Sequence, residues 1–237
     1  MKISAISRVR NEEHVIQDTL DHVANLVDDI YIYDDCSTDN TPDICESHPS
    51  VKKVIRGTEW ADTSQGRDVS EGVDRQKPYI EAMKSPDKPD YIYCFDADEF
   101  ADFDGIDFTH DYYRLRLFNF YATEEDKDKT WKERVYMGPE YRDITMLFKP
   151  TPRVRFGDRE PGGLGGNGLR AGYVKEYGKA FSEKEWEDTC DYYINYFPRW
   201  SRKWQARKGK FIHTNSDFGR PLIKWEDRFD ESKITRI

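Results

Sequence analysis

The sequence predicts an α/β protein with a Rossmann-like, mostly parallel sheet that is flanked by helices. Three short runs with strand-forming residues, at 3–9, 30–33 and 51–55, alternate with two segments of helical patterning. This alternation is typical of parallel strands joined by crossover helices. A fourth apolar run, residues 91–95, leads directly into three carboxylates. The second half of the chain is patterned differently, and we expect a mixed arrangement of elements there.

The first strand and helix follow from the residues around Asn11. Residues 3–9 are apolar enough to predict a strand. Asn11 is a favourable N-cap, and two glutamates follow it where the helix dipole favours acidic side chains. Ile16 and Leu20 share one face at helical spacing. The sequence therefore predicts a helix that begins after Asn11 and runs to about residue 27.

The next segments are marked by proline and by polar residues. Thr41 and Pro42 suit the cap and the first residue of a second helix. We expect residues 57–74 to form a loop. Residues 76–83 predict a further helix, and Pro78 leaves open the residue at which it starts.

The second half is expected to combine strands, loops and one helix. Ser182 and Glu185 form a capping-box pattern, and Pro198 ends the helix that they start. Residues 157–172 are rich in glycine and are expected to form a loop. The remaining expectations are strands at 112–121, 144–148 and 153–156, a solvated loop at 124–134, a basic run at 199–210 and a strand end at 211–213.

Composition argues against some classes of function. The net charge is −9, whereas sequence-independent binding to nucleic acid needs a basic surface, so we do not expect such binding. The amino terminus lacks the apolar region of a signal peptide, and no apolar run approaches the ~20 residues that span a bilayer. The four cysteines form no CxxC pair, which favours reduced thiols. We therefore expect a soluble, cytoplasmic protein.

Polar side chains follow three of the predicted strands: Arg8 and Arg10 at the first, Asp34 and Asp35 at the second, and Asp96 and Asp98 at the fourth. In a parallel sheet these strand ends lie side by side. Arginine binds bases and phosphates, and a pair of carboxylates can hold a divalent cation. For each residue alone, a salt bridge, a turn cap or a solvated acidic turn is the alternative. The joint pattern favours a nucleotide-like ligand.

Three motifs in this order resemble the GT-A glycosyltransferases of the family 2 type. They are Val9-Arg10-Asn11-Glu12-Glu13, Tyr33-Asp34-Asp35-Cys36-Ser37-Thr38-Asp39 and Phe95-Asp96-Ala97-Asp98-Glu99-Phe100. The resemblance covers about residues 3–102. It implies a single GT-A domain over residues 1–237, with a nucleotide-sugar-binding half at 1–102 and an acceptor-binding half at 103–237.

The resemblance also implies roles for the matching residues. Asp35 would bind the base, and Asp98 would ligate Mn²⁺ or Mg²⁺ directly. Asp96 would lie near the ribose and the metal. The expected nucleotide-binding set is Arg8, Arg10, Glu12, Asp35, Arg75 and Asp96.

A base must also take the proton of the acceptor hydroxyl. The candidates are Glu160, Asp158 and Asp191, of which Glu160 is favoured because relatives often carry a His-Glu pair after a strand. Arg159 stands where that histidine would be. The alternative for Glu160 is an ion pair with a neighbouring arginine.

A late histidine often completes the metal site of such enzymes, and His213 is the candidate here. Alternatively, His213 has only a structural role, with its ring hydrogen-bonded at the surface or at the edge of the core. Glu176 is a rival candidate for the metal ligand. Lys208 and Lys210 are candidates to close over a diphosphate, although a solvated basic face is the favoured interpretation of that run.

The resemblance thus implies a metal-dependent glycosyltransferase that uses a nucleotide-diphosphate sugar, with a UDP-sugar favoured, and inverts the anomeric carbon. One alternative is a non-catalytic sugar- or nucleotide-binding module of the same fold. Another is a haloacid-dehalogenase-like phosphatase, but Phe100 stands where that motif needs Thr or Val.

Overall fold

The computed structural model describes residues 1–237, apart from the side chain of Asp68. The chain forms two compact units. The amino-terminal unit comprises Met1–Leu115 and Ile144–Gly172, and the carboxy-terminal unit comprises Arg116–Asp143 and Tyr173–Ile237. Our prediction of a single domain with a nucleotide-sugar-binding half at 1–102 and an acceptor-binding half at 103–237 stays a prediction.

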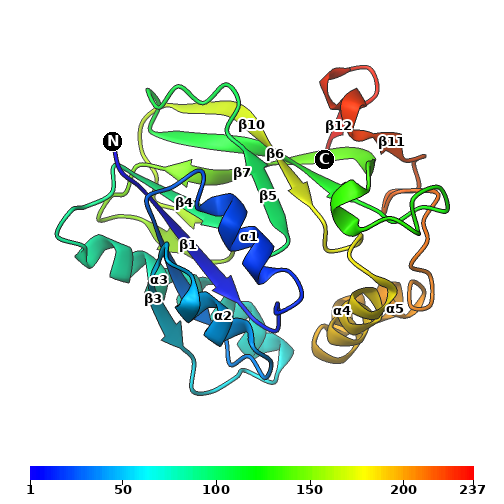
Figure 1. The fold of residues 1–237 in the computed structure, drawn as a ribbon, viewed down its shortest axis with the longest axis horizontal. Coiled ribbons are helices and arrows are strands. Elements are labelled where there is room, and N and C mark those ends of the chain that lie inside the picture. Colours follow the sequence, from blue (N-terminus) through cyan, green and yellow to red (C-terminus); the bar gives the residue numbers. More distant parts are fainter. The chain divides into compact units, whose positions relative to one another are not determined.

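The amino-terminal unit begins with the predicted alternation of strands and helices (Figure 1). Strands β3, β2, β1 and β4 are neighbours in that order and run parallel. The prediction of an α/β fold with a parallel sheet is therefore confirmed. The elements are β1 (Ile3–Val9), α1 (Ile16–Val23), β2 (Asp29–Asp34), α2 (Thr41–Ser47), β3 (Val51–Arg56), α3 (Ser64–Lys84), β4 (Tyr91–Phe95) and β5 (Glu99–Asp102).

Helices cover both faces of this sheet. The chain crosses over from β1 to β2 and from β2 to β3 in one direction along the sheet. Helix α3 then leads in the opposite direction, from β3 past β2 and β1 to β4. Because such crossovers are right-handed, α3 lies on the face opposite α1 and α2. Strands β1, β2 and β4 are accordingly buried almost throughout.

The strand register brings the carboxyl ends together, as predicted. Val9 lies beside Asp34, which in turn lies beside Arg56 on β3. Ser7 lies beside Phe95, and its hydroxyl donates to the Phe95 carbonyl at 2.7 Å. Residues that follow β1, β2 and β4 therefore emerge at one edge of the sheet.

The first helix starts later than predicted, at Ile16 rather than after Asn11. Asn11 adopts a left-handed backbone conformation, with φ of 53°. Its side-chain oxygen accepts from the Thr38 amide at 2.8 Å, and its own amide donates to the Ser37 hydroxyl at 3.0 Å. Asn11 thus ties the loop after β1 to the loop after β2 instead of capping a helix.

The prediction of a loop over residues 57–74 is wrong for most of that segment. Helix α3 starts at Ser64, and the Thr63 hydroxyl caps it by accepting from the Gly66 amide. The helix continues through Pro78 to Lys84. Proline lacks an N–H donor and disfavours a helix interior, which is why the sequence pointed to a much shorter helix.

The segment after β5 contains more strand than predicted. The expected loop at 157–172 includes β9 and the start of β10, and β8 and β9 form a small antiparallel hairpin. Strand β7 pairs antiparallel with β4, and the hydrogen-bonded order continues from β7 through β6 and β10 to β5. The bounds are β6 (Tyr112–Phe120), β7 (Tyr136–Phe148), β8 (Arg155–Phe156), β9 (Pro161–Gly162) and β10 (Gly168–Glu176).

The carboxy-terminal unit contains the predicted helix after Ser182, whose hydroxyl accepts from the Glu185 amide. Residues 211–213 do not form the expected strand end. The core of this unit includes Trp186, Cys190 and Trp204. Its further elements are the 3₁₀ helices η1 (Trp131–Glu133) and η2 (Trp225–Phe229), the helices α4 (Glu183–Tyr196) and α5 (Pro198–Gln205), and the short strands β11 (Ile223–Lys224) and β12 (Thr235–Arg236), which pair with β7.

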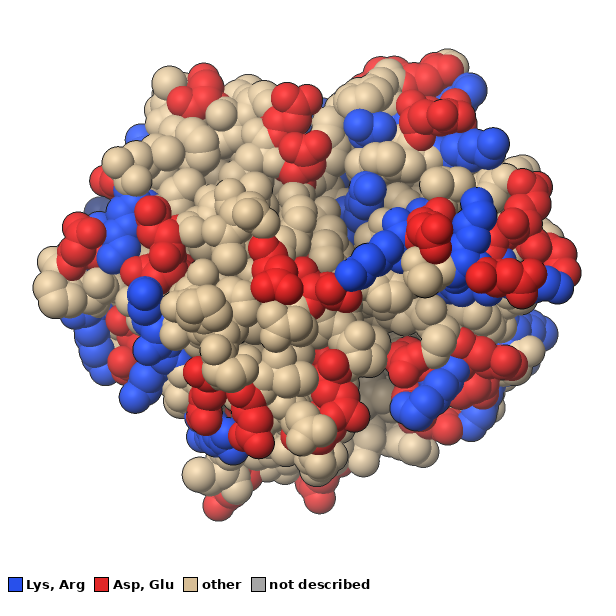
Figure 2. Space-filling model, viewed as in Figure 1, with Lys and Arg blue, Asp and Glu red and all other residues tan. Residues whose placement is uncertain are grey.

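Charged side chains of both signs are intermixed on the face seen in Figure 2. Among the helices that the structure describes, none has the length and apolar character needed to cross a bilayer.

Candidate functional site

The candidate site lies where β1, β2 and β4 end, and Asp35 is one of its buried carboxylates. Asp35 follows β2 and is 1% exposed. Arg8 Nη2 lies 2.6 Å and Arg67 Nη1 lies 2.7 Å from its Oδ2 atom. A buried carboxylate needs such partners, because an unpaired charge is costly away from water.

The pKa of Asp35 is raised to about 6. Burial is the largest cause, and the nearby carboxylates of Asp74 and Asp34 add to it. Arg8 and Arg10 act in the opposite direction and offset part of the increase. Asp35 is therefore ionised at neutral pH but close to the range in which it takes up a proton.

Helix α3 supplies one side of the site. Arg8 Nη1 donates to Glu71 at 2.7 Å, and Arg75 Nε donates to the other oxygen of the same carboxylate at 2.7 Å. Helix α3 carries four of the site residues at helical spacing, so that they share one face: Arg67, Glu71, Asp74 and Arg75. Sequence reasoning missed Glu71 and Asp74 because it expected a loop here. Their helical spacing is the signal that could have found them.

Arg10 fixes the backbone after β2. Its Nη1 atom donates to the carbonyl oxygens of Asp35 and Cys36 at 2.6 and 2.7 Å. Its guanidinium also stacks over the Trp60 ring, 4.1 Å from the centroid. Arg10 thus shapes the loop that carries Asp35, and its predicted contact with the nucleotide stays a prediction.

Asp96 is held by two arginines. Arg75 Nη2 donates to its Oδ1 atom at 2.6 Å, and Arg159 Nε lies 3.3 Å from its Oδ2 atom. Burial by itself would raise the pKa of Asp96, but Arg75 and Arg159 outweigh it and lower the pKa to about 2. Arg159 also pairs with the buried Glu99, whose Oε2 atom accepts from the Asp96 amide at 3.0 Å.

Asp98 lies near a second carboxylate, Glu12. The pKa of Glu12 is raised well above its usual value, first by burial and then by Asp98, Asp96 and Asp39. Among the described side chains, no group of three or more His, Cys, Asp or Glu residues is arranged to hold a metal ion. Mg²⁺, however, is commonly held by one or two carboxylates together with substrate phosphates and water. Asp98 and Glu12 would supply the two carboxylates of such a site.

The two base candidates in this unit, Asp158 and Glu160, are exposed and lie two residues apart in sequence. Glu160 Oε2 accepts from the Thr145 amide at 2.8 Å, and Asp158 Oδ1 accepts from the Glu160 amide at 3.0 Å. The neighbouring arginine, Arg159, is directed to Asp96 and Glu99.

The remaining candidates belong to the carboxy-terminal unit. The His213 ring packs against Tyr121 and Trp186, and burial lowers its pKa, which favours the neutral form that binds metals. Asp191 pairs with Lys208. Glu176 lies 3.3 Å from Arg142, and Lys210 Nζ donates to the Ala206 carbonyl. Their roles stay predictions.

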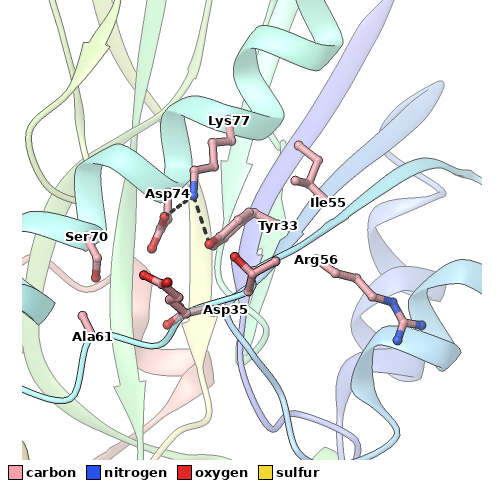
Figure 3. Close-up of a pocket in the computed structure, with 11 residues that line it drawn as sticks. Tyr33, Asp35, Ile55, Arg56, Ala61, Ser70, Asp74 and Lys77 are labelled. Carbon is pink, nitrogen blue, oxygen red and sulfur yellow. Dashed lines mark hydrogen bonds and ion pairs between the residues drawn. The ribbon is translucent and has the colours of Figure 1, made fainter.

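A pocket of about 350 Å³ opens beside Asp35, within the amino-terminal unit (Figure 3). Its walls come from the end of β2, the segment after β3 and one face of α3. The lining residues are Tyr33, Asp35, Ile55, Arg56, Gly57, Thr58, Glu59, Ala61, Ser70, Asp74 and Lys77. The arginine–carboxylate network therefore borders a space in the size range of small-molecule sites.

Residues 4–67 match the family model described as glycosyl transferase family 2. The match spans β1 to β3 and the start of α3, and it includes Arg8, Arg10 and Asp35. The predicted resemblance is therefore confirmed over these residues, which are similar in sequence to family 2 glycosyltransferases. The match ends before Asp96 and Asp98, whose roles stay predictions.

Two curated relatives are similar to part of this chain. They are the uncharacterized proteins Rv3786c of Mycobacterium tuberculosis and Mb3815c of Mycobacterium bovis, each 34% identical over 104 residues. The alignment covers 41% of this chain and 23% of each relative. This chain therefore spans less than a quarter of the length of the curated relatives that it matches.

Two solved structures are similar at low sequence identity. TarS of S. aureus (residues 1–349) is 14% identical, with 89% of this chain and 70% of that chain covered and a TM-score of 0.46. Glucosyl-3-phosphoglycerate synthase of Mycobacterium tuberculosis is 15% identical, with 54% and 47% covered and a TM-score of 0.29.

Proposed function

We propose that this chain is a metal-dependent glycosyltransferase. It moves a sugar from a nucleotide-diphosphate sugar, with a UDP-sugar favoured, to an acceptor hydroxyl, with inversion of the anomeric carbon. The observation that carries the proposal is the buried arginine–carboxylate network at the ends of β1, β2 and β4, beside a pocket. Ligands of open α/β sheets bind at this edge.

In this proposal the base of the nucleotide lies against Asp35. Arg8 and Arg67 both hold the Oδ2 atom of Asp35, so they act as positioning residues for its carboxylate. Arg10 holds the loop that carries Asp35. A carboxylate fixed in this way can accept a hydrogen bond from a base N–H without first reorganising, which favours binding.

The diphosphate would lie near Asp96 and Asp98. Asp98, with Glu12 as the second carboxylate, would hold Mn²⁺ or Mg²⁺, which neutralises the negative charge that develops on the leaving diphosphate. Asp96 keeps Arg75 and Arg159 at the same edge of the sheet. Their guanidinium groups add positive charge where the diphosphate departs.

Inversion requires one displacement, in which the acceptor hydroxyl attacks the anomeric carbon as the diphosphate leaves. Glu160 is proposed to take the hydroxyl proton, with Asp158 and Asp191 as alternatives. Glu160 is exposed, and its Oε2 atom is oriented by the Thr145 amide. His213 remains the proposed third metal ligand, with Glu176 as its rival.

The first ligands to test come from the solved structures. TarS has been solved with UDP-GlcNAc, and the mycobacterial synthase with Mn²⁺, UDP and glucosyl-3-phosphoglycerate.

The experiment is a panel of UDP-, GDP-, CDP- and ADP-sugars, incubated with the chain and Mn²⁺ and scored for slow release of the nucleoside diphosphate. We expect release from at least one donor and its loss on addition of EDTA. Asp98→Asn should slow release by about a hundredfold, because charge stabilisation of the leaving group is lost. Asp104→Asn is the matched control, because Asp104 is an exposed aspartate beyond β5.

Release that persists in EDTA and in Asp98→Asn would contradict the metal-dependent mechanism. Metal-dependent nucleotide binding without release from any donor would support the non-catalytic binding module instead. Neither binding nor release with any nucleotide would overturn the nucleotide-sugar proposal.

A further inference from the structure

Three cationic side chains of the carboxy-terminal unit lie around one carboxylate, that of Asp217. Arg207 Nη2 is 2.5 Å from Asp217 Oδ1, and the Asp217 amide donates to the Tyr121 hydroxyl at 3.1 Å. Burial alone would raise the pKa of this carboxylate, but Lys179, Arg207 and Lys203 outweigh it and lower the pKa. We call these three cations, together with Asp217, the basic cluster.

The basic cluster holds more positive charge than Asp217 can balance. Arg207 forms the ion pair with Asp217, so the charges of the two lysines remain. Lys203 is exposed on α5, and none of the residues that the structure describes forms a hydrogen bond or an ion pair with it. Partial burial lowers the pKa of Lys203, and the charges of Arg207 and Lys179 lower it further. An anion between these side chains would offset their mutual repulsion.

The other two cations have hydrogen-bond donors that remain for a ligand. Lys179 Nζ donates to Asn119 Oδ1 and lies 3.8 Å from Glu176. Glu176 itself also lies 3.3 Å from Arg142. An ammonium group has three N–H donors, so at least one donor of Lys179 is left over. Arg207 Nη1 is buried and has no hydrogen-bond partner among the described residues, whereas buried donors in proteins normally have one.

Aromatic side chains hold two of the cations in position before a ligand binds. The Arg207 guanidinium lies over the Trp204 ring, 4.9 Å from the centroid, and the Arg207 carbonyl accepts from Trp186 Nε1 at 3.4 Å. Lys179 Nζ lies over the Tyr121 ring, 5.8 Å from the centroid. Cations that are fixed in this way lose little freedom when they bind an anion, which favours affinity.

We propose that the basic cluster binds the phosphate group of the acceptor, so that the acceptor substrate is a phosphorylated molecule with a free hydroxyl. Arg207 offers a planar guanidinium, and Lys179 and Lys203 offer ammonium groups, all of which donate to phosphate oxygens. Three cations beside one carboxylate suit a phosphate monoester, whose charge is about −1.5 to −2 near neutral pH. This inference rests on the proposed function, because it takes the phosphate to belong to an acceptor.

The test is an NMR titration of the ¹⁵N-labelled full chain with glycerol 3-phosphate, and with glycerol as the uncharged reference. We expect glycerol 3-phosphate to shift the amide signals around the basic cluster and to bind at least about tenfold more tightly than glycerol, because its hydrogen bonds join charged groups. Lys203→Gln and Lys179→Gln should each weaken this binding about tenfold. Neither variant should change the affinity for UDP with Mn²⁺.

Arg202→Gln is the matched control. Arg202 is exposed and directly precedes Lys203 on α5, and one residue along a helix turns the side chain by about 100°. It removes the same charge from the same helix, so glycerol 3-phosphate should bind to it as to the wild type. The melting temperatures of the three variants would show that each of them folds.

Two outcomes would support the inference and identify the kind of acceptor. Sedimentation with vesicles of phosphatidylglycerol but not of phosphatidylcholine, lost in Lys203→Gln, would show that the phosphate belongs to a lipid. Binding of glycerol 3-phosphate without binding to either vesicle would indicate a water-soluble acceptor.

Three outcomes would overturn the inference. They are equal affinity for glycerol 3-phosphate and glycerol, an equal loss of binding in Arg202→Gln and Lys203→Gln, and a loss of UDP affinity in Lys203→Gln, which would assign the basic cluster to the donor diphosphate. In each of these cases UDP binding by the wild type would leave the proposed function standing. Failure of the wild type to bind any nucleotide would instead overturn the proposed function, whatever glycerol 3-phosphate does.

Discussion

At the scale of single residues, two aspartates of one motif have different surroundings. Asp96 has an arginine on each oxygen, and its pKa is lowered to about 2. Asp98 is instead close enough to Glu12 to raise the pKa of that carboxylate. The sequence could place both aspartates after β4, but it could not show this difference. One of the two arginines, Arg159, lies far along the chain and reaches Asp96 only through tertiary packing.

Asp35 leads to a prediction about pH. Because its pKa is raised to about 6, the carboxylate becomes protonated as the pH falls below that value and loses the acceptor that a base N–H requires. Affinity for the base should be constant between pH 7 and pH 8 and fall about tenfold per pH unit below 6. The ligand should be uridine or guanosine, whichever base binds, because neither carries a phosphate or needs a metal.

An NMR titration between pH 5 and pH 8 would measure this dependence. Asp35→Asn should bind more weakly at pH 7 and show no inflection near pH 6. Affinity that stays constant or increases toward pH 5 in the wild type would show that the ionised Asp35 carboxylate does not bind the base.

At the scale of elements, α3 contributes most to the site and was the least predictable. The first two strands of the β-α-β-α-β segment were predictable because each is a short, largely apolar run. Strand β3 is less apolar, but valine and isoleucine still favour a strand there. Helix α3 carries charged residues on its site-facing side and a proline inside it, so apolar periodicity could not reveal it. The packing of α3 against the β8–β9 hairpin could not be read from local sequence either.

Gly72 gives a prediction about that packing. A Cβ atom at Gly72 would lie 2.4 Å from the Phe156 carbonyl oxygen and 2.7 Å from the Gly157 carbonyl carbon. Backbone atoms cannot yield as a flexible side chain can. Gly72→Ala should therefore lower the free energy of unfolding by about 1–3 kcal/mol, despite the better helix propensity of alanine.

Urea denaturation followed by circular dichroism would measure this change. Gly165→Ala is the control, because a Cβ atom there meets nothing within 4 Å. Equal stability of wild type and Gly72→Ala would mean that α3 does not pack closely against the hairpin.

At the scale of the whole molecule, the chain divides in a way that the sequence did not indicate. Strands β6, β7 and β10 each contribute residues to both units. Asp191 and His213 belong to the carboxy-terminal unit, whereas Asp35, Asp98 and Glu160 belong to the amino-terminal unit. The nucleotide side of the candidate site was predictable because its residues follow consecutive strands. Sequence reasoning left the acceptor side open because its candidates come from distant segments.

A crystal structure of the chain with Mn²⁺ and UDP would test the nucleotide site most directly. We expect the base in the pocket, with its ring N–H on Asp35. We expect the metal ion on Asp98, bridging to the diphosphate. A nucleotide bound away from the ends of β1, β2 and β4, or a metal ion that does not contact Asp98, would contradict the proposed function.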